Sequence, residues 1–231
     1  MKKPIDAIFF DIDDTLFSTS VFADSARHAA IEAMIAAGLR ADREAATREL
    51  EEVITEFSSN YGGHFDKVLD RLGPESTAGH NRAVIVAAGV VAYHQTKWRE
   101  LRVHDDVQDV LRWLATTPLV RGVISAGITI KQAEKLVRLD VLEFLTPSAI
   151  FFTDQVGFSK PNPKLYRRVL QRLQLRPERC IYVGDNPTHD IDPVKREGWT
   201  AVRIRRSGRH AREEGAERAD HEVRDFHQLR A

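Results

Sequence analysis

Ile5-Asp6-Ala7-Ile8-Phe9-Phe10, followed directly by Asp11-Ile12-Asp13-Asp14-Thr15, is the stretch that decides the fold of this chain. A short, mostly apolar run of this kind predicts a strand that is buried on both faces, as in a parallel sheet. The cluster of carboxylates marks the point at which that strand ends. Similar apolar runs recur further along the chain, at residues 120–125, 149–153, 180–183 and 201–204.

Apolar residues recur at helical spacing between these runs, in residues 105–115, 130–139 and 163–173. Each of these segments has a single apolar stripe, which is typical of a helix that packs on a sheet. Strands that alternate with helices predict an α/β fold with a doubly wound parallel sheet and right-handed crossovers. A further short strand is expected at residues 221–223, in the polar tail.

The segment from about Ser20 to Trp98 breaks this alternation, because it reads as helical and contains no convincing buried strand. We therefore interpret residues 19–100 as a helical domain inserted after the first strand. Residues 1–18 and 101–231 are interpreted as the α/β core. Within the insert, helices are expected at residues 21–37, 41–57 and 81–98.

Composition and charge exclude several classes of protein. The 34 Lys and Arg balance the 34 Asp and Glu, so no overall field favours nucleic acid or an anionic membrane. The single cysteine, Cys180, excludes an intramolecular disulfide and fits a reducing compartment. No stretch approaches the roughly 20 apolar residues that span a bilayer, and the first apolar run is too short and too acidic for a signal peptide. We expect a cytoplasmic protein with neither a nucleic acid nor a membrane as its partner.

Carboxylates crowd the end of the first predicted strand, and in open α/β sheets ligands bind beyond the carboxyl ends of the strands. Asp11, Asp13 and Asp14 repel one another unless a cation or a proton is shared among them. A hard divalent metal ion, which prefers oxygen ligands, resolves this conflict.

Polar groups also follow two other predicted strands. A hydroxyl and backbone N–H groups in Ser125-Ala126-Gly127, just before a predicted helix, suit a phosphate. Gly184 is expected to let the backbone turn sharply, so that Asp185 points toward the same end of the sheet. Lys160 stands at the entry to the predicted helix that begins near Pro163.

Four short motifs, taken in this order and at this separation, resemble those of the haloacid-dehalogenase-like superfamily: Asp11-x-Asp13-Asp14-Thr15, Ser125-x-Gly127, Lys160-Pro161 and Gly184-Asp185-x4-Asp190. Each motif alone is a weak signal, but the four together, each at a predicted strand end or helix start, are specific. The resemblance covers the whole Rossmann-like core. The helical insert stands where that superfamily places a helical cap, which we expect to close over the substrate.

The resemblance implies roles for particular residues. Asp11 would attack phosphorus and become an aspartyl-phosphate, and Asp13 would act as general acid and then general base. Mg²⁺ would be held by the Asp11 carboxylate, the backbone carbonyl of Asp13 and the Asp185 carboxylate. The implied phosphate-binding groups are Ser125, the Ala126 N–H and Lys160. Asp190 would hold the metal ligands or Lys160 in place.

The expected function is therefore that of a magnesium-dependent phosphomonoesterase acting on a small phosphorylated metabolite. An Asp at position 13 favours phosphoryl transfer over carbon–halogen cleavage, because dehalogenases of this superfamily resemble phosphatases but lack that carboxylate. Ala126 departs from the Asn that is usual in the second motif, which removes a side-chain contact but keeps the backbone N–H. Two alternatives stay open: a phosphomutase of the same superfamily, and a non-catalytic protein that binds a phosphorylated ligand. Neither the substrate nor the oligomeric state follows from the sequence.

Overall fold

The computed structural model describes residues 4–58, 61–206, 208 and 210–230. The chain forms two compact units, one made of residues 1–20 and 101–231 and the other of residues 21–100. We call the first the α/β unit and the second the helical unit. Their interpretation as a catalytic core and a cap stays a prediction.

The α/β unit is built on a six-stranded sheet in which all neighbouring strands are parallel. The strand order is β3-β2-β1-β4-β5-β6, so β1 lies at the centre and the chain winds outward from it in both directions. This confirms the predicted α/β fold with a doubly wound parallel sheet. The strands are β1 (Ala7–Phe10), β2 (Val120–Ser125), β3 (Ile150–Phe152), β4 (Cys180–Gly184), β5 (Thr200–Ile204) and β6 (His221–Val223).

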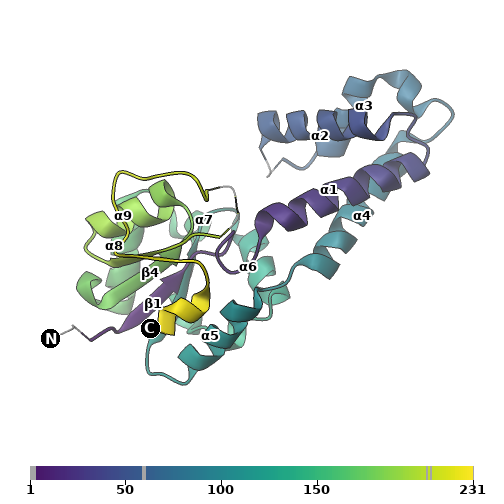
Figure 1. Cartoon of the computed structure of the whole chain (residues 1–231). Coiled ribbons are helices and arrows are strands. Elements are labelled where there is room, and N and C mark those ends of the chain that lie inside the picture. The colour runs from purple at the N-terminus through teal and green to yellow at the C-terminus, as the bar shows by residue number, and fades with distance from the viewer. Residues whose placement is uncertain (1–3, 59–60, 207, 209, 231) are drawn as a thin grey trace. The chain divides into compact units, whose positions relative to one another are not determined.

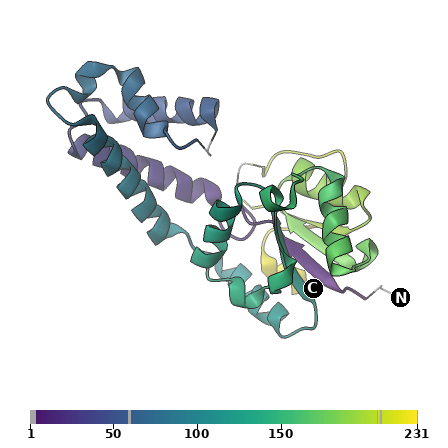
Figure 2. The ribbon, with the colours of Figure 1, turned by 180° about the vertical axis from the view of Figure 1, so that it is seen from behind.

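Helices cover both faces of this sheet (Figures 1 and 2). Phe9 belongs to a buried cluster that includes Leu165 and Val169 of α8, whereas the next residue, Phe10, stacks on Phe226. Successive strand residues thus face opposite layers, which explains why the sequence of β1 is apolar without alternation. The helices of this unit are α5 (Asp105–Ala115), α6 (Thr129–Arg138), α7 (Thr153–Val156), α8 (Pro163–Leu173) and α9 (Asp192–Arg196).

The register of the sheet brings three of the predicted motifs to one edge. Phe10 pairs with Val123 of β2 on one side and with Val183 of β4 on the other. Asp11 follows Phe10 directly, and Ser125 and Asp185 each follow the paired residue by two positions. The winding direction also reverses beside β1, which is the switch point at which ligands bind in open α/β sheets.

The helical unit has its own core. Met34 of α1, Leu50 and Val53 of α2, and Ile85 of α4 belong to one buried cluster. Helices α1 and α4 approach closely, because a Cβ on Gly89 would lie 2.8 Å from Cγ of Met34. None of the helices in the described residues is long and apolar enough to cross a membrane. The helices of this unit are α1 (Thr19–Ala36), which begins in the α/β unit, α2 (Arg43–Phe57), α3 (His64–Leu72) and α4 (Arg82–Glu100).

Candidate active site

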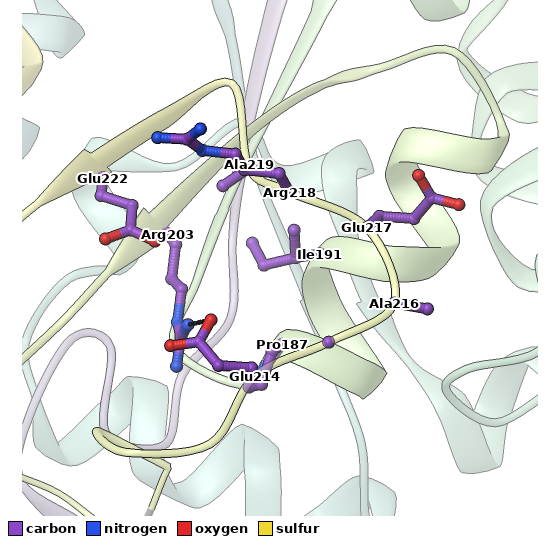
Figure 3. A pocket seen from close by; sticks show the side chains of 10 residues that line it. Pro187, Ile191, Arg203, Glu214, Ala216, Glu217, Arg218, Ala219 and Glu222 are labelled. Atoms are coloured by element: carbon purple, nitrogen blue, oxygen red, sulfur yellow. Dashed lines mark hydrogen bonds and ion pairs between the residues drawn. The ribbon is translucent and has the colours of Figure 1, made fainter.

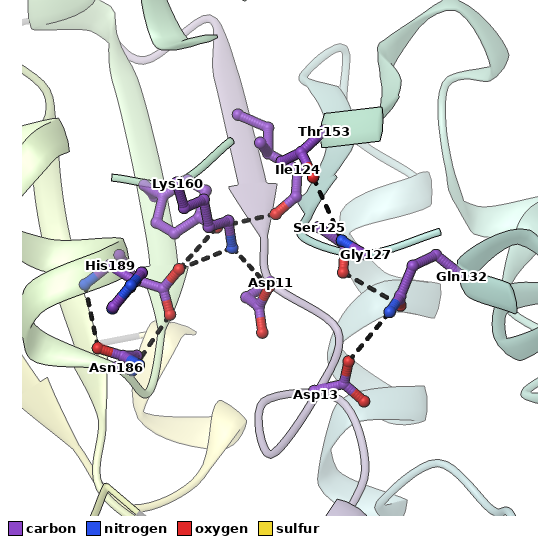
Figure 4. A network of polar contacts seen from close by, with 12 residues as sticks. Asp11, Asp13, Ile124, Ser125, Gly127, Gln132, Thr153, Lys160, Asn186 and His189 are labelled. Atoms are coloured by element: carbon purple, nitrogen blue, oxygen red, sulfur yellow. Dashed lines mark hydrogen bonds and ion pairs between the residues drawn. The ribbon is translucent and has the colours of Figure 1, made fainter. Parts of the chain in front are cut away.

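A buried ion cluster lies just beyond the carboxyl ends of β1 and β4 (Figure 4). The Lys160 ammonium donates to Oδ1 of Asp11 at 2.6 Å and to Oδ1 of Asp190 at 2.7 Å. All three residues are less than 9% exposed. Lys160 is thus fixed beside the predicted nucleophile, where a cation can also contact the oxygens of a bound phosphoryl group.

Asp190 is held by the protein as well as by Lys160. It lies in the short π-helix Pro187–Ile191, and its carboxylate accepts from the Tyr182 hydroxyl at 3.2 Å and from the Asn186 N–H at 3.1 Å. These contacts fix the Asp190 carboxylate next to Lys160, and the supporting role that the resemblance implies for Asp190 stays a prediction.

Two residues next to the site shape the backbone. Asp14 adopts a φ of 54° and accepts a hydrogen bond from the Thr19 N–H at 2.8 Å, which joins the turn after β1 to the start of α1. The prediction that Gly184 allows a sharp backbone turn is wrong, because the φ of Gly184 is not in the left-handed region. A Cβ on Gly184 would instead lie 2.6 Å from the Asp190 side chain. Glycine is needed at this position for space, not for a sharp turn.

The carboxylate of Asp185 lies close to the two carboxylates of this ion cluster. Asp11, Asp185 and Asp190 each offer an oxygen atom, and these oxygens lie within 4.8 Å of one another. When all three carboxylates are ionised, three negative charges face a single ammonium group, and the cluster has an excess of negative charge. Hard oxygen donors with excess negative charge fit a divalent cation such as Mg²⁺.

The pKa values of these carboxylates also indicate that a further cation fits this site. Burial raises the pKa of Asp185 to about 8, and the nearby Asp190 and Asp11 contribute to the increase. Burial also raises the pKa of Asp11 to about 7, although Lys160 opposes this change. For Lys160, burial alone would lower the pKa, but Asp11 and Asp190 outweigh it and raise the pKa. Without a further cation, the ionised carboxylates are therefore unfavourable in the folded protein.

Asp13 does not point toward this cluster but is held by helix α6 (Figure 4). The Lys135 ammonium donates to both carboxylate oxygens of Asp13, at 2.6 and 2.7 Å. The Thr19 hydroxyl donates to Oδ1 at 3.0 Å, and Nε2 of Gln132 lies 3.4 Å from Oδ2. Gln132 also accepts from the Ser125 hydroxyl at 3.2 Å, and so connects the first and second motifs.

The predicted phosphate-binding segment follows β2. Ser125 is buried at the end of the strand, and Ala126 is exposed. Gly127 has a φ of +133°, and a Cβ there would lie 2.7 Å from Nε2 of Gln132. The glycine of the second motif is therefore needed both for its backbone conformation and for the space that the Gln132 amide occupies.

Comparison with known proteins gives the family. A model of the haloacid dehalogenase-like hydrolases matches residues 5–198, which include β1, α9 and all four motifs. The chain belongs to this family. The predicted resemblance and the predicted class of enzyme, a hydrolase, are confirmed.

Two similar relatives have the same name. The glyceraldehyde 3-phosphate phosphatase of Methanopyrus kandleri is 41% identical over 224 residues, which cover 96% of this chain and 92% of that protein. The enzyme of the same name from Methanocaldococcus jannaschii is 35% identical over 225 residues, covering 97% and 95%. A solved structure of a haloacid dehalogenase-like phosphatase from Thermococcus onnurineus aligns with a TM-score of 0.67 and 24% identity, over 98% of this chain and 96% of its own. The prediction of a phosphomonoesterase for a small phosphorylated metabolite is confirmed by these relatives.

A pocket is lined in part by Pro187 and Ile191, the two ends of the π-helix that carries Asp190. It has a volume of about 300 Å³, and it is bordered by Arg203, Glu214, Glu217 and Glu222 (Figure 3). Arg203 pairs with Glu214 at 3.2 Å and donates to backbone oxygens of the same segment. Two arginines, Arg203 and Arg218, and three glutamates line the pocket, so its lining carries no excess of positive charge that would favour a phosphate ester.

The raised pKa values predict how the metal-free protein responds to pH. In the unfolded chain, carboxyl groups lose their protons near pH 4, whereas Asp11 and Asp185 in the folded protein keep theirs up to about pH 7 and 8. The folded state therefore binds more protons in this window, and the free energy of unfolding falls as the pH rises from about 4 to 8. In EDTA, we expect thermal denaturation to show a lower Tm at pH 8 than at pH 5.5, by on the order of 5 °C.

The Asp185→Asn variant provides the control for this prediction. It removes one titrating carboxylate, so its Tm in EDTA should fall less between pH 5.5 and pH 8 than that of the wild type. Mg²⁺ should raise the wild-type Tm more at pH 8 than at pH 5.5, and should have little effect on the variant. An equal Mg²⁺ effect in both proteins would contradict the metal role of Asp185.

Proposed function

We propose that this protein hydrolyses glyceraldehyde 3-phosphate, or a phosphate ester of closely similar size, in a magnesium-dependent reaction. The observation that carries the chemistry is the buried contact of Lys160 with Asp11, at the switch point of the sheet. The substrate is inferred from the similarity to the phosphatase of Methanopyrus kandleri, which extends over 96% of this chain.

Asp11 is the proposed nucleophile. Its carboxylate oxygen forms a bond to phosphorus while the bond from phosphorus to the ester oxygen breaks, which leaves an aspartyl-phosphate. Asp13 gives its proton to the departing oxygen, so that an alcohol and not an alkoxide leaves. In the second step a water oxygen bonds to phosphorus, Asp13 takes a proton from that water, and the bond between Asp11 and phosphorus breaks.

The charges around Asp11 are proposed to make this attack possible. Lys160, the Ser125 hydroxyl and the Ala126 N–H bind the phosphoryl oxygens and stabilise the negative charge of the transfer. Asp11, Asp185 and the backbone carbonyl of Asp13 would hold Mg²⁺, which when bound neutralises charge between the nucleophile and the phosphate. Asp190 keeps Lys160 in place through their 2.7 Å contact.

A comparison of phosphate esters tests this function. Purified protein should release phosphate from glyceraldehyde 3-phosphate with a kcat/KM at least about 10-fold higher than from phosphoserine, a ribulose bisphosphate or p-nitrophenyl phosphate, within the usual 10⁴–10⁸ M⁻¹s⁻¹. Release should stop in EDTA and return with Mg²⁺. A preference for phosphoserine would overturn the substrate, and phosphate binding without any turnover would favour the ligand-binding alternative.

The helical unit is proposed to act as the cap that selects the substrate. The reason for this proposal is the position of the helical unit in the chain, directly after the segment that carries Asp11 and Asp13. If residues 21–100 are deleted, the preference for glyceraldehyde 3-phosphate over p-nitrophenyl phosphate should fall toward unity. An unchanged preference would assign selection to the α/β unit.

A further inference from the structure

Helix α6 presents two polar side chains to the catalytic carboxyl group, and neither belongs to the four motifs. Lys135 contacts both oxygens of Asp13, at 2.6 and 2.7 Å, and Gln132 lies 3.4 Å from one of them. We propose that Lys135, assisted by Gln132, is a positioning residue that fixes the orientation of Asp13 for proton transfer. This proposal rests on the role given to Asp13 in the proposed function.

Hydrogen-bond donors from two elements hold the Asp13 carboxylate in place. Lys135 and Gln132 are three positions apart on α6, so their side chains lie on the same face of the helix. The Thr19 hydroxyl, at the start of α1, donates to Asp13 from a second element at 3.0 Å. A carboxylate that receives hydrogen bonds from two elements has few orientations left, because turning either of its side-chain torsions breaks several contacts at once.

Both α6 side chains are themselves held in place. Gln132 is only 6% exposed, and it occupies the space that the missing Cβ of Gly127 leaves free. The Lys135 side chain is 15% exposed, and its ammonium lies 5.9 Å from the centre of the Phe17 ring. A long, solvated lysine would lose considerable side-chain entropy on binding Asp13, but this packing has already restricted its freedom.

Gln132 also links Asp13 to the phosphate-binding segment. Its Oε1 accepts from the Ser125 hydroxyl at 3.2 Å, while its Nε2 faces Asp13. The amide thereby sets the spacing between the group that binds the phosphoryl oxygens and the group that serves the departing oxygen. A displacement of about 1 Å in such a group costs on the order of 100-fold in rate.

The dependence on the leaving group distinguishes positioning from general support of the fold. An alkyl phosphate needs a proton on its departing oxygen, whereas p-nitrophenolate leaves without one. Hydrolysis of the aspartyl-phosphate also uses Asp13 and is common to both esters, so the comparison uses kcat/KM, which covers the steps up to departure of the leaving group. Lys135→Met should lower kcat/KM for glyceraldehyde 3-phosphate by about 100-fold, and kcat/KM for p-nitrophenyl phosphate by less than about 3-fold. Lys135→Arg, which keeps the donor, should recover most of the loss. Gln132→Leu also removes the contact with Ser125 and should therefore slow both esters, but its loss in kcat/KM should be about 10-fold larger for glyceraldehyde 3-phosphate than for p-nitrophenyl phosphate.

Lys195→Met is the matched control. It removes another lysine–aspartate contact of 2.6 Å, with Asp220, beside the opposite ends of the strands. Its activity on both esters should equal that of the wild type. Equal losses on the two esters in Lys135→Met, no loss on either, or a faster reaction would each overturn the proposal. If Lys135→Met does not fold, as judged by its thermal denaturation, Gln132→Leu decides the question by the same criterion.

Failure of the proposed substrate can be told apart from failure of this inference. If the wild type prefers another alkyl phosphate to glyceraldehyde 3-phosphate, that ester replaces it in the comparison with p-nitrophenyl phosphate. The ratio of the two losses then still tests the position of Asp13. Equal losses measured with the preferred ester would overturn the role of Lys135 whatever the substrate is.

Discussion

Replacing Asp11 with Asn is expected to lower phosphate release to the background rate, a loss of at least about 10⁴-fold. An amide has no anionic oxygen that can bond to phosphorus, so the aspartyl-phosphate cannot form. The fold should survive, because the Asn oxygen can still accept from Lys160, and the buried carboxylate that is removed has a pKa raised to about 7. In EDTA at pH 8, the variant should be at least as stable as the wild type.

Three measurements test this expectation together. Steady-state phosphate release gives the loss in kcat, and mass spectrometry of quenched reactions should detect a phosphoryl adduct on the wild type only. Asp6→Asn serves as the control, because Asp6 precedes the same strand and pairs with Arg179 at its other end. Turnover above about 1% of the wild type in Asp11→Asn would show that water attacks the ester directly, and it would remove the covalent step.

The sheet was predictable from the sequence because strands that are buried on both faces are short apolar runs. The predicted and observed limits coincide for β2 and β6, and they differ by a few residues for the other strands. The position of the site followed from the same reasoning, since the polar residues after β1, β2 and β4 must meet at one edge of a parallel sheet. Lys160 could be placed only by its order among the motifs, because a lysine in a loop is ordinarily solvated.

The contacts of Asp13 could not be predicted, because they join residues far apart in the chain. Lys135 is 122 positions from Asp13, and a lysine near the end of a helix is read as a solvated residue. One signal was present: Gln132 lies four residues before the buried Leu136, so a polar side chain interrupts the apolar face of α6. Helix α3 was also missed, because its nine residues lie between two glycine-containing breaks.

Lys160→Met is expected to damage stability and activity together. The substitution keeps most of the side-chain volume but leaves the carboxylates of Asp11 and Asp190 buried without their cation. Removing one partner of a buried ion pair costs about 3–5 kcal/mol, because the remaining charge stays desolvated. The Tm in EDTA at pH 8 should therefore fall by about 10 °C. The kcat should fall by about 100- to 1,000-fold, since a charge that stabilises the phosphoryl transfer is lost.

A double-mutant cycle with Asp190→Asn separates these two effects. In the Asp190→Asn background, one of the two carboxylates that lose their cation is already replaced by a neutral amide. Lys160→Met should therefore cost less stability in this background than in the wild type, by about 1–3 kcal/mol. Activity should not recover in the double variant, because the amide of residue 190 cannot replace a cation beside Asp11. Denaturant unfolding measures the stability loss, and phosphate release measures the activity. A stability loss that is equal in both backgrounds would show that Lys160 does not stabilise the Asp190 carboxylate. Recovery of activity in the double variant would instead show that Lys160 only neutralises Asp190, and that the phosphoryl group is stabilised by other residues.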